Sequence, residues 1–227
     1  MDIVVLTGAG MSSESGLKTF RDTDGLWEGF NVDDVASAEG WERDKKMVLD
    51  FYNNLRSQLE EAEPNEGHYG LAALEKHFNV EIITQNVDNL HERAGSKKVL
   101  HLHGELTKVR STIDESLVYD IGYGKISLGD KCGKGSQLRP HIVFFGEPVP
   151  NLQKAIEITS KADIFLVIGS SLNVYPAAGL ISYAPEEAEL FLIDPKNVSI
   201  PSGRYVNVIS MLASEGVKEF TKIIMNK

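Results

Sequence analysis

The sequence has a single cysteine, Cys132, among its 227 residues. One cysteine cannot close a disulfide within the chain, and it excludes every zinc site that needs two or more cysteines of this chain. Long apolar runs are also missing, because none approaches the roughly 18 residues of a membrane-spanning helix. The N-terminus lacks the basic start and long apolar core of a secretory signal. We therefore expect a cytoplasmic protein with no membrane partner.

Positive charge is scarce as well. The chain carries 23 Lys and Arg against 33 Asp and Glu, a formal net charge of −10. A field of this sign repels phosphate backbones, so nucleic acid is not an expected partner, whereas basic peptides are weakly attracted. The alternative is that the charge only keeps the protein soluble. A hydrophobic fraction of 42% is near the globular average, which predicts a folded core rather than disorder.

Short apolar runs rich in Val and Ile recur along the chain, with helical patterns between them. Such runs are typical of strands buried on both faces of a parallel sheet. The pattern predicts an α/β fold, a Rossmann-like parallel sheet with helices on both faces. The expected strands cover residues 3–6, 80–84, 99–102, 142–145, 164–168, 190–193 and, more weakly, 205–209.

Two stretches do not fit this alternation, and we expect them to meet in a small second lobe. Residues 29–62 contain a long amphipathic helix that stops before Pro64. Residues 105–139 are rich in glycine and read as a turn-rich hairpin excursion. The main domain then comprises residues 1–28, 63–104 and 140–227. The helical stripe consists of Val48, Phe51, Tyr52, Leu55 and Leu59.

Small polar residues follow the first expected strand. Gly8, Ala9, Gly10 and Ser12 lie where a glycine turn lets the backbone approach a pyrophosphate. Ser13 stands in place of the third glycine of a dehydrogenase fingerprint, which disfavours hydride transfer. A tight turn without any ligand is the alternative.

Polar side chains also end the later strands, at the edge where a parallel sheet binds ligands. Amide and carboxylate groups there can hold a ribose diol or a carboxamide, although Asn86 or Asp88 can equally cap a helix. His103 ends a strand and is the best placed of six histidines to act as a general base. The other residues of this set are Gln85, Gly169, Ser170, Ser171 and Asp194.

In this order the segments resemble the sirtuins, the NAD-dependent protein lysine deacylases. The resemblance spans nearly the whole chain, and its N-terminal part is most similar to the bacterial-type branch. It rests on residues 8–12, Phe20-Arg21, residues 84–88, His103-Gly104, residues 144–147 and residues 169–171.

The resemblance implies a role for each matching residue. The cofactor NAD would contact Gly8, Ala9, Gly10, Ser12, Phe20, Arg21, Gln85, Asn86, Asp88, Gly169, Ser170, Ser171 and Asp194. His103 would be the catalytic base, aided by Asn86 and Asp88. An acyl-lysine peptide would contact Tyr52, Arg56, Val143, Phe144, Phe145, Gly146 and Glu147, with residues 143, 146 and 147 pairing as a strand.

The implied reaction removes the acyl group from lysine and releases nicotinamide and O-acyl-ADP-ribose. Two alternatives stay open: mono-ADP-ribosyl transfer to a protein, or a weakly active NAD-binding interaction module. We expect a monomer.

Two departures from the family pattern matter. The four cysteines of the usual zinc site align with Ser111, Asp114, Cys132 and Gly135, so we expect no bound zinc. The desuccinylating branch has Tyr-x-x-Arg on the long helix, but here Leu55 stands third after Tyr52 and Arg56 comes next. Arg56 could reach an acidic acyl group, or Leu55 could favour neutral chains. Equally, Tyr52 and Leu55 could be core residues and Arg56 solvated.

Overall fold

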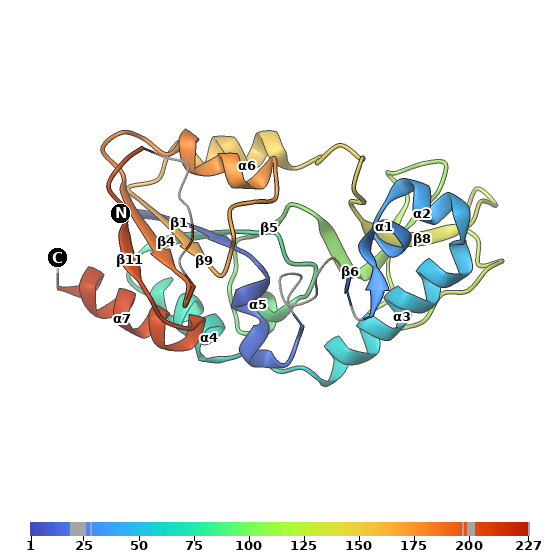
Figure 1. Ribbon diagram of the computed structural model, residues 1–227, viewed down its shortest axis with the longest axis horizontal. Helices are drawn as coiled ribbons and strands as arrows, with labels where there is room; N and C mark the ends of the chain where they lie inside the picture. Colours follow the sequence, from blue (N-terminus) through green and yellow to red (C-terminus); the bar gives the residue numbers. More distant parts are fainter. Residues whose placement is uncertain (19–25, 28, 197, 199–202, 227) are drawn as a thin grey trace.

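The structure is a computed structural model that describes residues 1–18, 26–27, 29–196, 198 and 203–226. Within this part of the chain, six strands form one parallel sheet in the order β11-β10-β9-β1-β4-β5 (Figure 1). Their bounds are Asp2–Thr7 (β1), Asn79–Thr84 (β4), Val99–His101 (β5), Ile164–Ile168 (β9), Glu189–Ile193 (β10) and Asn207–Ile209 (β11). The expected Rossmann-like α/β fold is confirmed.

The central strand β1 shows why the apolar runs are uninterrupted. Ile3 and Val5 pack into the core on one face of the sheet, and Val4 and Leu6 pack into the core on the other. Successive side chains of a strand point to opposite faces, so a strand covered on both sides needs an apolar residue at every position.

Helices cover both faces. On one face, α4 (Glu66–Leu74) and α7 (Ala213–Met225) contribute Leu71 and Phe220 to the core. On the other, α6 (Leu152–Thr159) and the 3-10 helix η3 (Ala177–Tyr183) contribute Ala155 and Leu180. Figure 1 shows α6 on one side of the sheet and α4 and α7 on the opposite side.

The two insertions meet beyond the carboxyl edge of the sheet. The first contains β2 (Leu26–Trp27), β3 (Phe30–Asn31), α1 (Val32–Val35), α2 (Ala38–Arg43) and α3 (Lys45–Glu61). The second is a three-stranded antiparallel sheet, β7-β6-β8, formed by Val118–Asp120 (β7), Gly104–Ser111 (β6) and Leu138–Ile142 (β8). Val48, Phe51 and Leu59 of α3 pack with Leu106 and Val109 of β6 in one buried cluster, so the lobe has its own core.

The prediction of a parallel strand at residues 142–145 is wrong. Ile142 ends β8, which pairs antiparallel with β6. The chain then runs on to Phe145, which bridges Ser37 beside α2. The run is apolar because Ile142 and Phe144 face α3, whereas Phe145 is 47% exposed. Among the described residues, no helix is both long and apolar enough to cross a membrane.

Candidate active site

A cavity of about 500 Å³ lies where the order of strands reverses at the carboxyl ends of β1, β4 and β9. Such a switch point is where open parallel sheets bind their ligands. The small lobe forms its other wall, through Tyr52 and Leu55 of α3 and through residues 142–147. The cavity therefore lies between the two parts of the molecule.

Glycines at the ends of β1 and β9 let two loops touch through their backbones. A Cβ on Gly8 would lie 2.8 Å from the Gly169 oxygen, and one on Gly10 would lie 2.7 Å from the Gly169 Cα. The Gly10 N–H donates to the Gly169 carbonyl at 2.9 Å, and Gly169 has a φ of +60°. A side chain at position 8 or 10 would therefore collide with the backbone of the other loop. The turn after β1 continues as the 3-10 helix η1 (Ala9–Met11), and Ala9 and Gly10 line the cavity.

Asn86 joins this glycine turn to the end of β4. Its Nδ2 donates to the Gly8 carbonyl and to the Ser12 Oγ, both at 3.1 Å. Its backbone N–H donates to the Thr84 Oγ1 at 3.0 Å. The side chain is buried and lines the cavity. The hydrogen bonds fix both loops before any ligand binds.

Asp88 lies at the start of the short helix α5 (Leu90–Arg93) and also lines the cavity. Its carboxylate accepts hydrogen bonds from the Ser12 Oγ at 2.8 Å and from the Leu90 N–H at 3.1 Å. Burial raises the pKa of this carboxyl, although both hydrogen bonds oppose the shift. The contact with the Leu90 N–H fits the alternative that Asp88 caps a helix. The contact with Ser12 instead connects Asp88 to the glycine turn.

His103 follows β5 and lines the cavity. The Nδ1 lies 3.0 Å from the Gln85 carbonyl oxygen, which requires a proton on Nδ1 and leaves Nε2 as the basic nitrogen. Burial lowers the pKa of His103, with the Gln85 carbonyl opposing the shift. The imidazole is therefore neutral at pH 7 and able to accept a proton.

Ser170 and Ser171, which follow β9, and Asp194, which follows β10, also line the cavity. Gln85 reaches them across the sheet, because its Nε2 donates to the Ser170 Oγ at 2.9 Å. The Asp194 carboxylate accepts from the Lys196 N–H at 2.9 Å, so it also closes the turn at Pro195. Phe20 and Arg21, the expected cofactor-loop residues, lie outside the described residues.

Residues 143–147 form the wall nearest the small lobe, and each of them lines the cavity: Val143, Phe144, Phe145, Gly146 and Glu147. The Val143 N–H donates to the His103 carbonyl at 3.0 Å, and the Phe145 N–H to the Ala36 carbonyl at 2.8 Å. The segment is thus tied to the candidate base on one side and to the lobe on the other.

On α3, Tyr52 and Leu55 face the cavity, but Arg56 is not among its lining residues. The side chain of Arg56 is fully buried, and its Nε donates to the Leu106 carbonyl at 2.8 Å. Burial lowers the pKa of Arg56 to about 10, so it stays charged at neutral pH. The alternative of a solvated Arg56 is wrong, and its guanidinium points to β6 rather than into the cavity.

Several apolar cavity residues were not expected from the sequence. Leu17, Val87, Leu106, Val149, Val174 and Tyr175 line the cavity, although none of them was expected to contact a ligand. The position of Val174 and Tyr175 shortly after Gly169-Ser170-Ser171 is a sequence signal that could have pointed to these two residues.

The four positions that align with zinc-binding cysteines hold a hydrogen-bonded cluster. The Cys132 Sγ lies 3.3 Å from the Ser111 Oγ and 3.1 Å from the Ser136 Oγ. The Asp114 carboxylate pairs with Lys134 at 2.6 Å, and Gly135 offers no side-chain donor. One thiol, one hydroxyl and one neutralised carboxylate do not fit tetrahedral zinc. In the described part of the chain, no three His, Cys, Asp or Glu side chains converge on a possible metal position.

These contacts define what the cavity can do chemically. One wall offers small residues and backbone groups suited to a dinucleotide, and the other wall is aromatic and aliphatic. A neutral imidazole lies between them, held by the Gln85 carbonyl. His103 contacts both walls, through the Gln85 carbonyl and the Val143 N–H, so ligands bound to the two walls would meet beside it.

Comparisons with known proteins agree with this arrangement. The model of the Sir2 family matches residues 8–176. The NAD-dependent protein deacylase of Bacteroides thetaiotaomicron is 54% identical over 232 residues, covering 99% of this chain and 98% of that protein. A solved Sir2 homolog–NAD complex has a TM-score of 0.89 at 35% identity and covers 99% of this chain and 90% of its own. A mutant Sir2 homologue with 2'-O-acetyl ADP ribose also has a TM-score of 0.89 at 35% identity, covering 99% and 92%. The chain therefore belongs to the Sir2 family, the sirtuins.

Proposed function

We propose that this chain is an NAD-dependent protein lysine deacylase that releases nicotinamide and transfers the acyl group to ADP-ribose. The observation that carries the proposal is the position of His103, between a dinucleotide-compatible wall and an apolar wall of one cavity. Membership of the Sir2 family and 54% identity to a deacylase over nearly the full length support it.

NAD, a substrate of the reaction, supplies a ribosyl carbon that becomes electrophilic as nicotinamide leaves. Gly8, Ala9 and Gly10 hold its phosphates, and Ser170, Ser171 and Asp194 hold the adenosine side. Asn86 and Asp88 orient the nicotinamide ribose and carboxamide, with Gln85 between the two halves. The hydrogen bonds among Ser12, Asn86 and Asp88 keep these groups fixed, which lowers the cost of aligning the reacting atoms.

His103 serves as the general base. The acyl-amide oxygen attacks the ribosyl carbon as the bond to nicotinamide breaks, and the Nε2 of His103 then takes a proton from a ribose hydroxyl so that the hydroxyl can attack the acyl carbon. Cleavage of the acyl C–N bond then releases the lysine amine, and addition of one water leaves the acyl group on ADP-ribose. The Gln85 carbonyl keeps the Nδ1 proton in place throughout and stabilises the imidazolium.

The acyl chain that fits this cavity is neutral. Tyr52, Leu55 and Phe144 form its wall, and the buried arginine of α3, Arg56, donates to the Leu106 carbonyl instead of facing the cavity. A carboxylate on the acyl chain would therefore be desolvated without a cationic partner from α3. We assign a preference for acetyl over succinyl, with the substrate peptide paired to the backbone of residues 143–147.

We further propose that the enzyme works without structural zinc. The Ser111–Cys132–Ser136 cluster and the Asp114–Lys134 ion pair take the place of the metal ligands. Metal analysis of the purified protein should find less than stoichiometric zinc, and prolonged treatment with a chelator should leave deacylation unchanged. Stoichiometric zinc, or activity that a chelator removes and zinc restores, would contradict this proposal.

We also propose that the protein is a cytoplasmic monomer and that it has no nucleic-acid partner. The net charge of −10 opposes nucleic-acid binding, and the single cysteine, buried in the lobe, suits a reducing compartment. Size-exclusion chromatography with light scattering tests the monomer, and fractionation of the producing cells tests the location.

The decisive experiment incubates the protein with NAD and acetyl- or succinyl-lysine peptides and follows nicotinamide and peptide mass together. Deacylation predicts loss of the acyl mass in step with nicotinamide release. A peptide or protein that gains the mass of ADP-ribose would instead indicate ADP-ribosyl transfer. NAD binding without any turnover would indicate an interaction module.

A further inference from the structure

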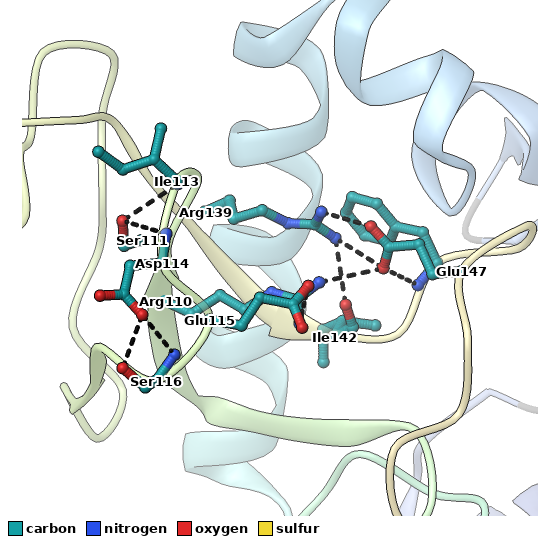
Figure 2. Close-up of polar contacts among 10 residues, drawn as sticks. Arg110, Ser111, Ile113, Asp114, Glu115, Ser116, Arg139, Ile142 and Glu147 are labelled. Carbon is teal, nitrogen blue, oxygen red and sulfur yellow. Dashed lines mark hydrogen bonds and ion pairs between the residues drawn. The ribbon is translucent and has the colours of Figure 1, made fainter.

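A buried cluster of two arginines and one glutamate lies beside the cavity wall that residues 142–147 form (Figure 2). Arg110 comes from β6, Arg139 from β8 and Glu147 from the end of the wall segment, residues 142–147. Their side chains are 7%, 9% and 19% exposed. Neither arginine lines the cavity itself.

The Glu147 carboxylate is saturated with hydrogen bonds. Arg139 donates from Nη1 to Oε1 at 2.6 Å and from Nη2 to Oε2 at 3.2 Å, a bidentate pair. Arg110 Nη2 donates to Oε2 at 3.2 Å, and the Phe144 N–H donates to the same oxygen at 2.9 Å. The Glu147 N–H returns to the Phe144 carbonyl at 3.0 Å. The carboxylate therefore closes the turn of residues 144–147 and fastens it to two strands.

Arg139 holds the beginning of the same segment as well. Its Nη2 donates to the Ile142 carbonyl at 3.2 Å, and its guanidinium lies 3.9 Å from the centre of the Phe144 ring. The Phe144 ring packs against Tyr52, with the ring centres 5.9 Å apart. Because Tyr52 and Phe144 both line the cavity, the position of Arg139 sets the position of the acyl wall.

The energetics favour a positioning role over a purely stabilising one. Desolvating three ionic groups costs about as much as their attraction returns, so a buried cluster of this kind contributes little net stability. What it does provide is a defined geometry, because bidentate Arg–carboxylate pairs tolerate few orientations. The segment that it orders also donates the Val143 N–H to the His103 carbonyl, so its position is tied to the base.

We propose that Glu147, Arg139 and Arg110 are positioning residues for the acylated peptide: they hold residues 143–147 at a fixed distance from His103 so that this segment can pair with the peptide and wall the acyl chain. This inference rests on the proposed deacylase function. It concerns the peptide side of the cavity alone, because the NAD-side contacts of Gly8, Asn86 and Gln85 come from other strands.

The three residues are not equivalent. Arg139 makes three of the hydrogen bonds and the ring contact, whereas Arg110 makes one bond to Glu147 and a second, exposed contact to Glu115. Replacing Glu147 removes the carboxylate that Arg110 and Arg139 share and leaves two like charges beside each other. We therefore expect the rise in the peptide KM to be largest for Glu147→Gln, smaller for Arg139→Lys and smallest for Arg110→Lys.

The test measures KM for an acetyl-lysine peptide, kcat, and the Kd for NAD without peptide in each variant. Glu147→Gln should raise the peptide KM by about tenfold or more and lower kcat, while the Kd for NAD changes less than about twofold. Arg139→Lys, which keeps the charge but loses the bidentate pair, should lie between Glu147→Gln and the unchanged protein. The matched control is Glu115→Gln, the same substitution at a 75% exposed partner of Arg110, which should leave all three constants unchanged.

An unchanged peptide KM in Glu147→Gln and Arg139→Lys would overturn the inference while the deacylase function stands. Parallel loss of NAD binding and peptide turnover in Arg110→Lys, the mildest variant, would also overturn it, because the cluster would then serve general folding. Failure of the unsubstituted protein to deacylate any peptide would instead reject the proposed function itself.

Discussion

At the scale of single residues, the proposed general base, His103, is held in one protonation state. Burial lowers the pKa of the imidazole below its ordinary value of 6.5, and the Gln85 carbonyl reserves Nδ1 as the donor. The neutral, proton-accepting form therefore dominates across the neutral range and persists into mild acid. A base of this kind does not need help from a neighbouring carboxylate.

His103→Ala should lower kcat by about 100-fold or more, because the ribose hydroxyl loses its proton acceptor. The Kd for NAD should change little, and His77→Ala, at an exposed position away from the cavity, should behave like the unsubstituted enzyme. Steady-state kinetics and NAD titration measure both effects. Full turnover in His103→Ala would remove this residue from the mechanism.

The pH profile of the unsubstituted enzyme provides a second check on His103. A base must be deprotonated to act, so kcat/KM falls as the pH drops through the pKa of the base. Since burial lowers that pKa, the acidic limb should lie below pH 6.5. A limb centred above pH 6.5 would mean that another group controls the rate.

Leu55 and Arg56 are neighbours in the sequence with opposite environments. Leu55→Arg should place a guanidinium in the cavity beside Tyr52 and raise the kcat/KM ratio of succinyl to acetyl peptides by about tenfold. Arg56→Ala should leave this ratio unchanged but destabilise the fold by about 3 kcal/mol, because it removes a buried donor from the Leu106 carbonyl. Parallel peptide kinetics and denaturant unfolding separate the two roles; a succinyl preference that Arg56→Ala abolishes would reverse the assignment.

At the scale of elements, the excursion between β6 and β8 is held by α3. The Asn53 side chain on α3 donates to the Ile126 carbonyl at 2.8 Å and accepts from the Ile126 N–H at 3.0 Å. Ile126 is buried against the same helix, and Tyr119 and Ile121 pack at the edge of this cluster, whereas Val118 is exposed. Tyr119, Ile121 and Ile126 therefore pack the excursion against α3, and Val118 does not belong to this cluster.

Asn53→Ala should lower the free energy of unfolding by about 1–3 kcal/mol, since it leaves the Ile126 N–H and carbonyl without their partner. The same substitution at the adjacent, exposed Asn54 is the matched control and should have little effect. Denaturant unfolding gives both values, and limited proteolysis should show faster cleavage within residues 105–139 in Asn53→Ala alone. Equal stability of the two variants would show that α3 does not anchor the excursion through this amide.

The parts of the site that the sequence reveals are those on consecutive strand ends. Gln85, His103 and Ser170 could be placed together because the carboxyl ends of parallel strands share one edge. Arg110 and Arg139 could not be assigned, because their meeting with Glu147 depends on the register between β6 and β8. The direction of the Arg56 side chain could not be predicted, because each helical residue is rotated by about 100° from the one before. A shift of one position along α3 is therefore enough to turn a side chain from the cavity to the core. The prediction of a parallel strand at residues 142–145 was wrong because burial against α3 produces the same apolar pattern as burial within a sheet.

At the scale of the whole molecule, two buried histidines join the helical layer to the sheet below the cavity. The His68 ring on α4 and the His91 ring on α5 meet edge to face, with their centres 4.8 Å apart. The His91 Nε2 lies 3.1 Å from the Thr7 Oγ1, which in turn donates to the Thr84 Oγ1 at 2.9 Å. Burial lowers the pKa of His68 to about 4 and that of His91 well below its usual value. Both rings are neutral in the folded protein.

Global stability should therefore fall in mild acid. The unfolded chain takes up a proton on His68 near pH 6.5, whereas the folded chain does so only near pH 4, so stability is complete above 6.5 and is lost as the pH falls towards 4. The titration of His68 alone should lower the free energy of unfolding by about 2 kcal/mol between pH 7 and pH 5. His91 adds a loss of the same sign.

Comparing His68→Gln with the unsubstituted chain isolates this contribution. Glutamine at position 68 can still accept from the Asn65 N–H, as His68 Nδ1 does at 3.2 Å, so the start of α4 stays capped. The stability difference between the two proteins, measured by denaturant unfolding, should shrink by about 2 kcal/mol between pH 7 and pH 5 because glutamine does not titrate. His77→Gln, at an exposed position, controls for loss of a histidine as such. A difference that stays constant with pH would mean that His68 titrates alike in the folded and unfolded chains, and that burial between α4 and α5 does not keep it neutral.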